Sequence, residues 1–132
     1  MVAVNLQGAA LCAKHLLPFM AVRRDASSPP PKTRKLVIVS SVLSQRATPP
    51  FAVYTSTKAS LDHLAWSLRT EFADSNVAVQ LLLPGATRTG FHQKAGIPEG
   101  AMDKTAFAAA PDMARRLCEH VDTSDEFQAG GK

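Results

Sequence analysis

The residues of this sequence best suited to chemistry are Ser41, Tyr54 and Lys58. Tyr54 and Lys58 are four positions apart at the start of a predicted helix, so their side chains share one face. A phenol is a poor base at neutral pH, but an ammonium held beside it stabilises the phenolate. Such a phenol can exchange a proton with a carbonyl or carbinol oxygen. Ser41 ends a predicted strand, where ligands collect in open α/β sheets, and its hydroxyl would hold that oxygen.

The Tyr-x-x-x-Lys spacing also has an ordinary explanation, an exposed helix turn with a solvated lysine. Lysine occupies 7 of the 132 positions, so any tyrosine has a chance of about one in twenty of a lysine four residues later. Two observations favour the chemical interpretation. Tyr54 is the only tyrosine, and a strand-end serine precedes it. Ser40, one residue earlier at the same predicted strand end, is the alternative to Ser41.

Hydrophobic periodicity predicts the elements that must position these side chains. Residues 2–22 favour a helix whose last turn Pro18 loosens or kinks. A polar, proline-rich connection follows over residues 25–35. Residues 36–39 are a short apolar run that predicts a strand buried on both faces. Residues 51–74 carry one apolar stripe, which is typical of an amphipathic helix.

The second half of the chain continues this alternation. Residues 77–83 predict another buried strand that stops at Pro84-Gly85, and residues 90–105 predict a loop. A short helix begins at Pro111-Asp112, and residues 126–128 are a candidate edge strand. This order indicates an α/β fold with right-handed crossovers. Two or three strands cannot cover themselves, so we expect an incomplete sheet that lacks strands N-terminal of the chain.

Four segments, in order, resemble the short-chain dehydrogenases/reductases. They are Val4-Asn5-Leu6-Gln7-Gly8, Val37-Ile38-Val39-Ser40-Ser41, Tyr54-Thr55-Ser56-Thr57-Lys58-Ala59 and Pro84-Gly85-Ala86-Thr87-Arg88-Thr89. The thirteen-residue separation of Ser41 and Tyr54 is the family's usual one. The resemblance covers residues 4–91. It implies a Rossmann-like, doubly wound parallel sheet in a single domain, residues 1–132.

The resemblance also implies a role for each matching residue. Tyr54 would donate or accept the proton, Ser41 would orient the substrate oxygen, and Lys58 would lower the pKa of the tyrosine. Lys58 would contact the nicotinamide ribose, and Asn5 would hold a water that links Lys58 to solvent. Asn5, Tyr54 and Lys58 would thereby contact the cofactor, NAD or NADP. Further residues would line the nicotinamide end of that cofactor: Pro84, Gly85, Thr87 and Thr89.

The sequence departs from the family at its N-terminal end. Family members begin with a strand and a Thr-Gly-x-x-x-Gly-x-Gly turn that cradles the pyrophosphate, and no segment here resembles it. The residues that choose NAD or NADP belong to that missing part. We therefore expect an NAD(P)-dependent oxidoreductase that interconverts a carbonyl and an alcohol, as a fragment of a longer enzyme.

Two alternatives stay open. One is a catalytically silent, truncated member of the family that acts as a dimerisation or interaction module through helices 2–22 and 51–74. In either form we expect a homo-oligomer through these helices, with Trp66 at a helix interface. The other alternative is a cofactor-independent lyase or isomerase that uses the tyrosine.

Composition and charge favour a globular protein of the cytoplasm. Hydrophobic residues make up 45% of the chain and charged residues 20%. The net charge of +4 is dispersed, which argues against nucleic-acid binding, and no apolar run is long enough to span a membrane. Cys12 and Cys118 lie in apolar helical patterns, so we expect buried thiols in a reducing compartment. The four histidines lack metal-ligand spacing, and no metal is expected.

Overall fold

The structure is a computed structural model that describes residues 1–22, 33–90, 94, 96, 107–121 and 126–129. In chain order its helices and strands are η1 (Ala3–Gly8, a π-helix), α1 (Ala9–Met20), β1 (Arg34–Val39), η2 (Val42–Gln45, a 3₁₀ helix), α2 (Ala52–Glu71), β2 (Val77–Pro84), β3 (Thr87–Arg88), β4 (Ala108–Ala109), α4 (Ala110–Val121) and β5 (Glu126–Ala129).

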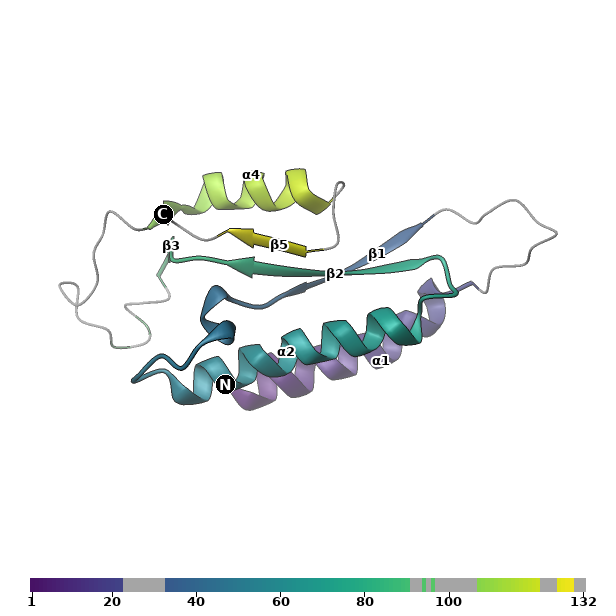
Figure 1. The fold of residues 1–132 in the computed structure, drawn as a ribbon, viewed down its shortest axis with the longest axis horizontal. Helices are drawn as coiled ribbons and strands as arrows, with labels where there is room; N and C mark the ends of the chain where they lie inside the picture. Colours follow the sequence, from purple (N-terminus) through teal and green to yellow (C-terminus); the bar gives the residue numbers. More distant parts are fainter. Residues whose placement is uncertain (23–32, 91–93, 95, 97–106, 122–125, 130–132) are drawn as a thin grey trace.

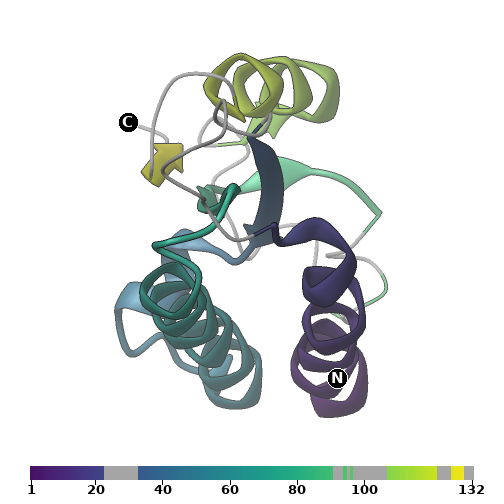
Figure 2. The ribbon, with the colours of Figure 1, turned by 90° about the vertical axis from the view of Figure 1, so that its right-hand side faces the viewer.

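The described strands form a parallel sheet with helices on both faces. Its order is β1-β2-β5, and both strand pairs are parallel. Helices α1 and α2 lie side by side against one face, and α4 lies over the other (Figure 1, Figure 2). Strands β3 and β4 pair separately as a second, two-stranded parallel sheet. The predicted doubly wound α/β arrangement is therefore present, with β1 at one edge of the described sheet.

Strand β2 is the centre of the core, and its side chains alternate between the two faces as a strand requires. Leu81 and Leu83 are at most 2% exposed and belong to the cluster formed with α1 and α2. Leu82 lies in the smaller cluster on the opposite face, with Met113 of α4. Ala65 of α2 is completely buried, which lets this helix approach the sheet closely. Burial of such leucines contributes about 1.5–3 kcal/mol each.

The predicted elements are found, with several changes at their ends. The helix predicted over 2–22 is a π-helical turn followed by α1, and it continues to Met20, two residues beyond Pro18. Pro18 has no amide hydrogen to donate to the Lys14 carbonyl, and the helix ends within two residues of it. The helix predicted over 51–74 is α2, and the candidate edge strand is β5. Most of the predicted connections 25–35 and 90–105 lie outside the described residues.

Two expectations about burial were wrong. Strand β1 is not buried on both faces, because Val39 is 49% exposed at the edge of the described sheet. Cys12 and Cys118 are free thiols but exposed, because α1 and α4 each bury only a narrow stripe of side chains. Trp66 is 42% exposed on α2, and the centroids of its ring and the His63 ring lie 5.7 Å apart in a T-shaped arrangement. No helix among the described residues is long and apolar enough to span a bilayer.

Candidate active site

Ser41 follows the last residue of β1 by two positions and begins the turn η2. Its backbone is extended, and its Oγ accepts a hydrogen bond from the Leu43 amide at 3.2 Å. The Ser41 carbonyl accepts from the Ser44 amide at 3.0 Å and the Ser44 hydroxyl at 2.6 Å. Only 7% of Ser41 is exposed. These contacts fix the backbone while leaving the Ser41 hydroxyl hydrogen without an acceptor among the described residues.

Ser40 has a different role from its neighbour. It is 4% exposed, and its Oγ donates to the Lys58 carbonyl at 2.9 Å. Its amide donates to the Leu82 carbonyl of β2 at 2.8 Å. Ser40 therefore attaches the end of β1 to helix α2 and to β2. Its hydroxyl hydrogen is already used, which favours Ser41 over Ser40 as the serine that meets a substrate oxygen.

Tyr54 and Lys58 lie on the first turns of α2, next to the end of β1. The Lys58 Nζ is 5.9 Å from the centroid of the Tyr54 ring, within the range of a cation–π contact. It donates a hydrogen bond to the Val39 carbonyl at 3.0 Å. Burial lowers the pKa of Lys58 below its ordinary value of 10.5, and the negative charge of Asp62 opposes that shift. The lysine is thus a partly buried cation beside the only phenol.

Asn5 lies in the π-helical turn η1, and such turns often occur at functional sites. Its Nδ2 donates to Thr57 Oγ1 at 3.1 Å. Thr57 is 4% exposed, and its hydroxyl donates to the Tyr54 carbonyl at 2.8 Å. Asn5 and Lys58 also line a common cavity of about 280 Å³ between α1, α2 and β1, whose other walls include Cys12. Thus Asn5 contacts the helix that carries Tyr54, and shares a cavity with Lys58.

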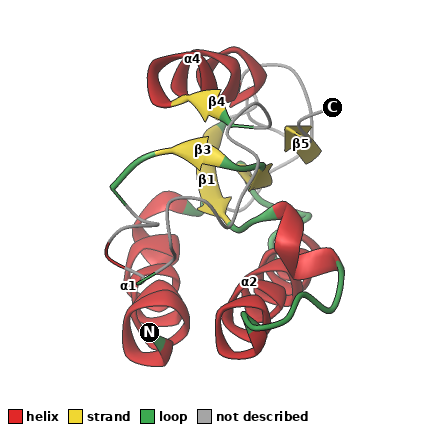
Figure 3. Cartoon of the chain, turned by 90° about the vertical axis from the view of Figure 1, so that its left-hand side faces the viewer, coloured by secondary structure: helices red, strands yellow, loops and turns green. Residues whose placement is uncertain are grey.

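The segment 84–89 lies at the same end of the sheet as Ser41. Because β1 and β2 are parallel, their carboxyl ends lie at the same end of the sheet. This end faces the viewer in Figure 3. Thr87 Oγ1 donates to the Gly85 carbonyl at 3.1 Å, and Ala108 N to the Ala86 carbonyl at 3.0 Å. Strand β3 carries Thr87 and pairs with β4. Of the predicted cofactor-lining residues, Pro84 is therefore the last residue of β2, and Gly85, Thr87 and Thr89 follow it directly.

Two residues of this region were missed by the sequence interpretation. Asp62 is 2% exposed, and its Oδ2 accepts a hydrogen bond from Gln45 Nε2 at 2.7 Å. Asp62 lies four residues after Lys58, so the same helical spacing that linked Tyr54 to Lys58 could have found it. Gln45 gave no signal, because its partner is distant in sequence. Within the described part of the chain, no group of three or more His, Cys, Asp or Glu residues could hold a metal ion.

The family model described as short chain dehydrogenase matches residues 1–99. The chain belongs to this family. The resemblance drawn from four short segments is thereby confirmed. Among curated relatives, the chain is 38% identical over 88 residues to the dehydrogenase/reductase SDR family member 4 of Bos taurus, covering 67% of this chain and 29% of that protein.

Two further comparisons bear on fold and activity. The chain is 33% identical over 81 residues to the inactive hydroxysteroid dehydrogenase-like protein 1 of Rattus norvegicus, covering 61% of this chain and 22% of that protein. The solved alcohol dehydrogenase of Thermococcus sibiricus, complexed with 5-hydroxy-NADP, superposes with a TM-score of 0.73 at 23% identity. That match covers 99% of this chain and 52% of the archaeal one. The chain therefore has an incomplete Rossmann-like fold and spans about half of such a structure.

The attachment made by Ser40 can be tested by stability. We expect Ser40→Ala to lower the free energy of unfolding by about 1–3 kcal/mol, because the hydrogen bond from the buried Ser40 hydroxyl to the Lys58 carbonyl is lost. Urea denaturation followed by circular dichroism measures the change. Ser56→Ala is the matched control, since the exposed Ser56 also donates to a carbonyl of α2. Equal effects of the two substitutions would contradict the assigned attachment.

Proposed function

We propose that this chain is the active-site half of an NAD(P)-dependent short-chain dehydrogenase/reductase that interconverts a carbonyl and an alcohol. The observation that carries the proposal is the attachment of α2 to the end of β1, which keeps Ser41 near the turn that bears Tyr54 and Lys58. Residues 1–132 would form a single domain of a longer enzyme. Its substrate would be a small carbonyl compound or alcohol.

The residues present fit one end of a nicotinamide cofactor. Lys58 and Asn5 offer hydrogen-bond donors beside the 280 Å³ cavity, as ribose hydroxyls require. Pro84 ends the buried strand β2, and Gly85, Thr87 and Thr89 follow it at the carboxyl end of the sheet, where such ligands bind. The pyrophosphate end has no glycine-rich turn in this sequence and would need residues of the longer enzyme.

The proposed chemistry uses four side chains of this chain. The bound cofactor would supply the hydride that reduces the carbonyl carbon. Ser41 would donate a hydrogen bond to the carbonyl oxygen and hold it towards the phenol. Tyr54 would give its hydroxyl proton to that oxygen, which yields the alcohol and leaves a phenolate. The ammonium of Lys58 would stabilise this phenolate by its charge, and Asn5 would hold the water through which a proton returns.

Tyr54→Phe tests the proposal most simply. The variant keeps the ring and removes the hydroxyl, so we expect kcat to fall by about 100-fold or more. Consumption of NADPH or NADH with a panel of ketones and aldehydes measures the rate. Thr70→Val is the control, because it removes an exposed hydroxyl from the same helix away from the site. Equal turnover by Tyr54→Phe and the unmodified chain would refute the assigned role of Tyr54.

A silent interaction module is the second candidate, and exposed apolar side chains favour it. Helices α1 and α2 leave Phe19 84%, Leu16 51% and Val53 59% exposed. Removal of such surface from water drives association. As an interaction module, the chain would oligomerise through α1 and α2 without binding a nicotinamide cofactor. A cytoplasmic location suits both candidates, because free thiols persist in a reducing compartment.

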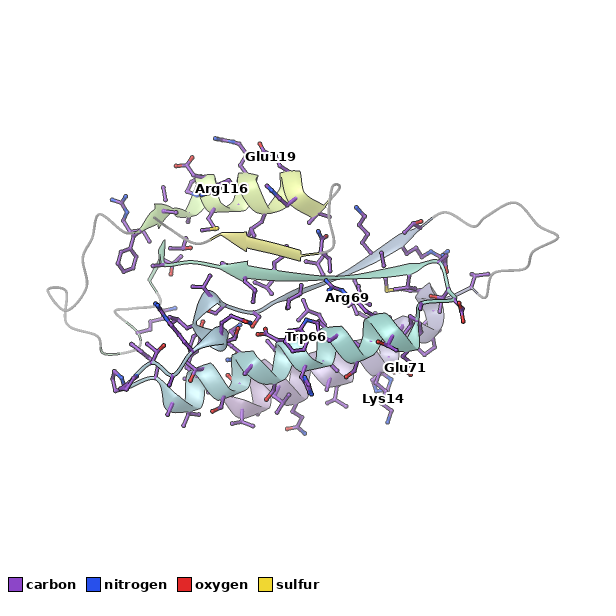
Figure 4. The ribbon with its side chains drawn as sticks, in the orientation of Figure 1. Lys14, Trp66, Arg69, Glu71, Arg116 and Glu119 are labelled. Carbon is purple, nitrogen blue, oxygen red and sulfur yellow. The ribbon has the colours of Figure 1, made fainter. Side chains whose placement is uncertain are left out.

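Phe19→Glu tests the oligomer. We expect the unmodified chain to sediment as a homo-oligomer and the variant to shift towards the monomer, because a charge replaces an exposed apolar anchor. Analytical ultracentrifugation measures the sedimentation of the unmodified chain and of the variant. Glu119→Gln on α4 is a control outside the proposed interface, on the opposite side of the sheet (Figure 4). A monomeric unmodified chain would exclude both the oligomer and the module, whereas an oligomer without cofactor binding would favour the module.

A further inference from the structure

Asp62 is a buried carboxylate that the proposed chemistry does not use. It is the only acidic side chain in the interior among the described residues, with 2% of its surface exposed. Its Oδ2 accepts from Gln45 Nε2, whereas its Oδ1 has no hydrogen-bond partner in the described part of the chain. Burial of a charge with unused acceptor capacity is costly. A role beyond packing is therefore expected for this side chain.

The first neighbour of Asp62 is Lys58, one helical turn earlier. Tyr54, Lys58 and Asp62 recur at four-residue intervals and share one face of α2. The charge of Asp62 favours the ammonium form of Lys58, against the burial that lowers the lysine's pKa. Cys12 of α1 is the other titratable side chain that lines the cavity with Lys58, and β1 presents the Val39 carbonyl there.

The second neighbour is the turn that carries Ser41. Gln45 Nε2 donates to Asp62 Oδ2 and lies 3.2 Å from Ser44 Oγ, to which it also donates. Ser44 Oγ in turn donates to the Ser41 carbonyl at 2.6 Å. Asp62, Gln45, Ser44 and Ser41 thus form one hydrogen-bonded chain from α2 to the turn η2. The Asp62 carboxylate is the buried end of this series of hydrogen bonds.

We propose that Asp62 is a positioning residue of the candidate active site. Through Gln45 and Ser44 it holds the turn that carries Ser41 against α2, and by its charge it stabilises the ammonium of Lys58. One carboxylate thereby acts on two side chains of the proposed chemistry, Ser41 and Lys58. The catalytic meaning of this link rests on the proposed function. The link itself is a property of the folded chain and is measured without turnover.

Asp62→Asn separates charge from hydrogen bonding, because the amide oxygen can still accept from Gln45. We expect the pKa of Lys58 to fall further in this variant, since the favourable negative charge is gone. Nuclear magnetic resonance on lysine labelled at Cε follows the titration, and Lys58→Arg identifies the signal. Glu71→Gln is the matched control, at the far end of the same helix (Figure 4). An equal Lys58 pKa in the two variants would overturn the electrostatic role.

Gln45→Leu tests the mechanical link and leaves the charge in place. We expect the amides of Leu43 and Ser44, which both bond to Ser41, to exchange with solvent about tenfold faster. The Lys58 titration should stay unchanged. Gln7→Leu, the same substitution at an exposed position, is the control. Unchanged exchange of these two amides in Gln45→Leu would overturn the positioning of Ser41.

The effect of Asp62 and Gln45 on catalysis is measured separately, by kcat and KM. Where the unmodified chain reduces a carbonyl, we expect Gln45→Leu and Asp62→Asn to lower kcat about tenfold, with KM nearly unchanged, because they disturb alignment and charge rather than substrate binding. Full kcat in both variants would overturn the proposed role in catalysis. A chain without turnover contradicts the proposed function alone, since the titration and exchange measurements still decide whether Asp62 positions Ser41 and Lys58.

Discussion

The arrangement of the candidate site depends on how helix α2 is attached to the end of strand β1. Two hydrogen bonds make this attachment, from Ser40 Oγ to the Lys58 carbonyl and from Lys58 Nζ to the Val39 carbonyl. The Ser40 amide is directed to β2, so the neighbouring Val39 carbonyl lies on the side of β1 away from that strand. Lys58 therefore supplies a donor to a carbonyl at the edge of the described sheet. The same side chain that serves the proposed chemistry also fixes the geometry.

The rest of the fold keeps this attachment in place. Strand β2 is buried on both faces, with α1 and α2 on one side and α4 on the other, so its position is set by two hydrophobic clusters. Strand β1 is in register with β2 from Arg34 to Val39, and this pairing sets the depth at which β1 ends. Asn5 and Thr57 join η1 to the first turns of α2. The candidate side chains thus project from rigid elements, while only a short turn carries Ser41.

The sequence was sufficient for the parts of the site that follow from local periodicity. The apolar stripe of residues 51–74 predicted the helix that carries Tyr54 and Lys58, and the apolar run before Ser41 predicted one strand end. The link between Asp62 and Gln45 could not be predicted, because seventeen positions separate them and only burial reveals its significance. The apolar helical pattern around Cys12 wrongly predicted a buried thiol, because such a pattern does not show how much of the helix surface other elements cover. Strands β3 and β4, each two residues long, are too short to leave a pattern.

The proposed function requires that Ser41, Tyr54 and Lys58 form a site for hydride and proton transfer to a carbonyl. Reduction of a ketone with a nicotinamide cofactor deuterated at its transferable position is the most direct measurement. We expect the deuterium to be recovered on the carbinol carbon of the product, and this recovery to be lost when Tyr54 is replaced by phenylalanine. No transfer by the folded, unmodified chain at saturating cofactor, or the same transfer without the Tyr54 hydroxyl, would contradict it.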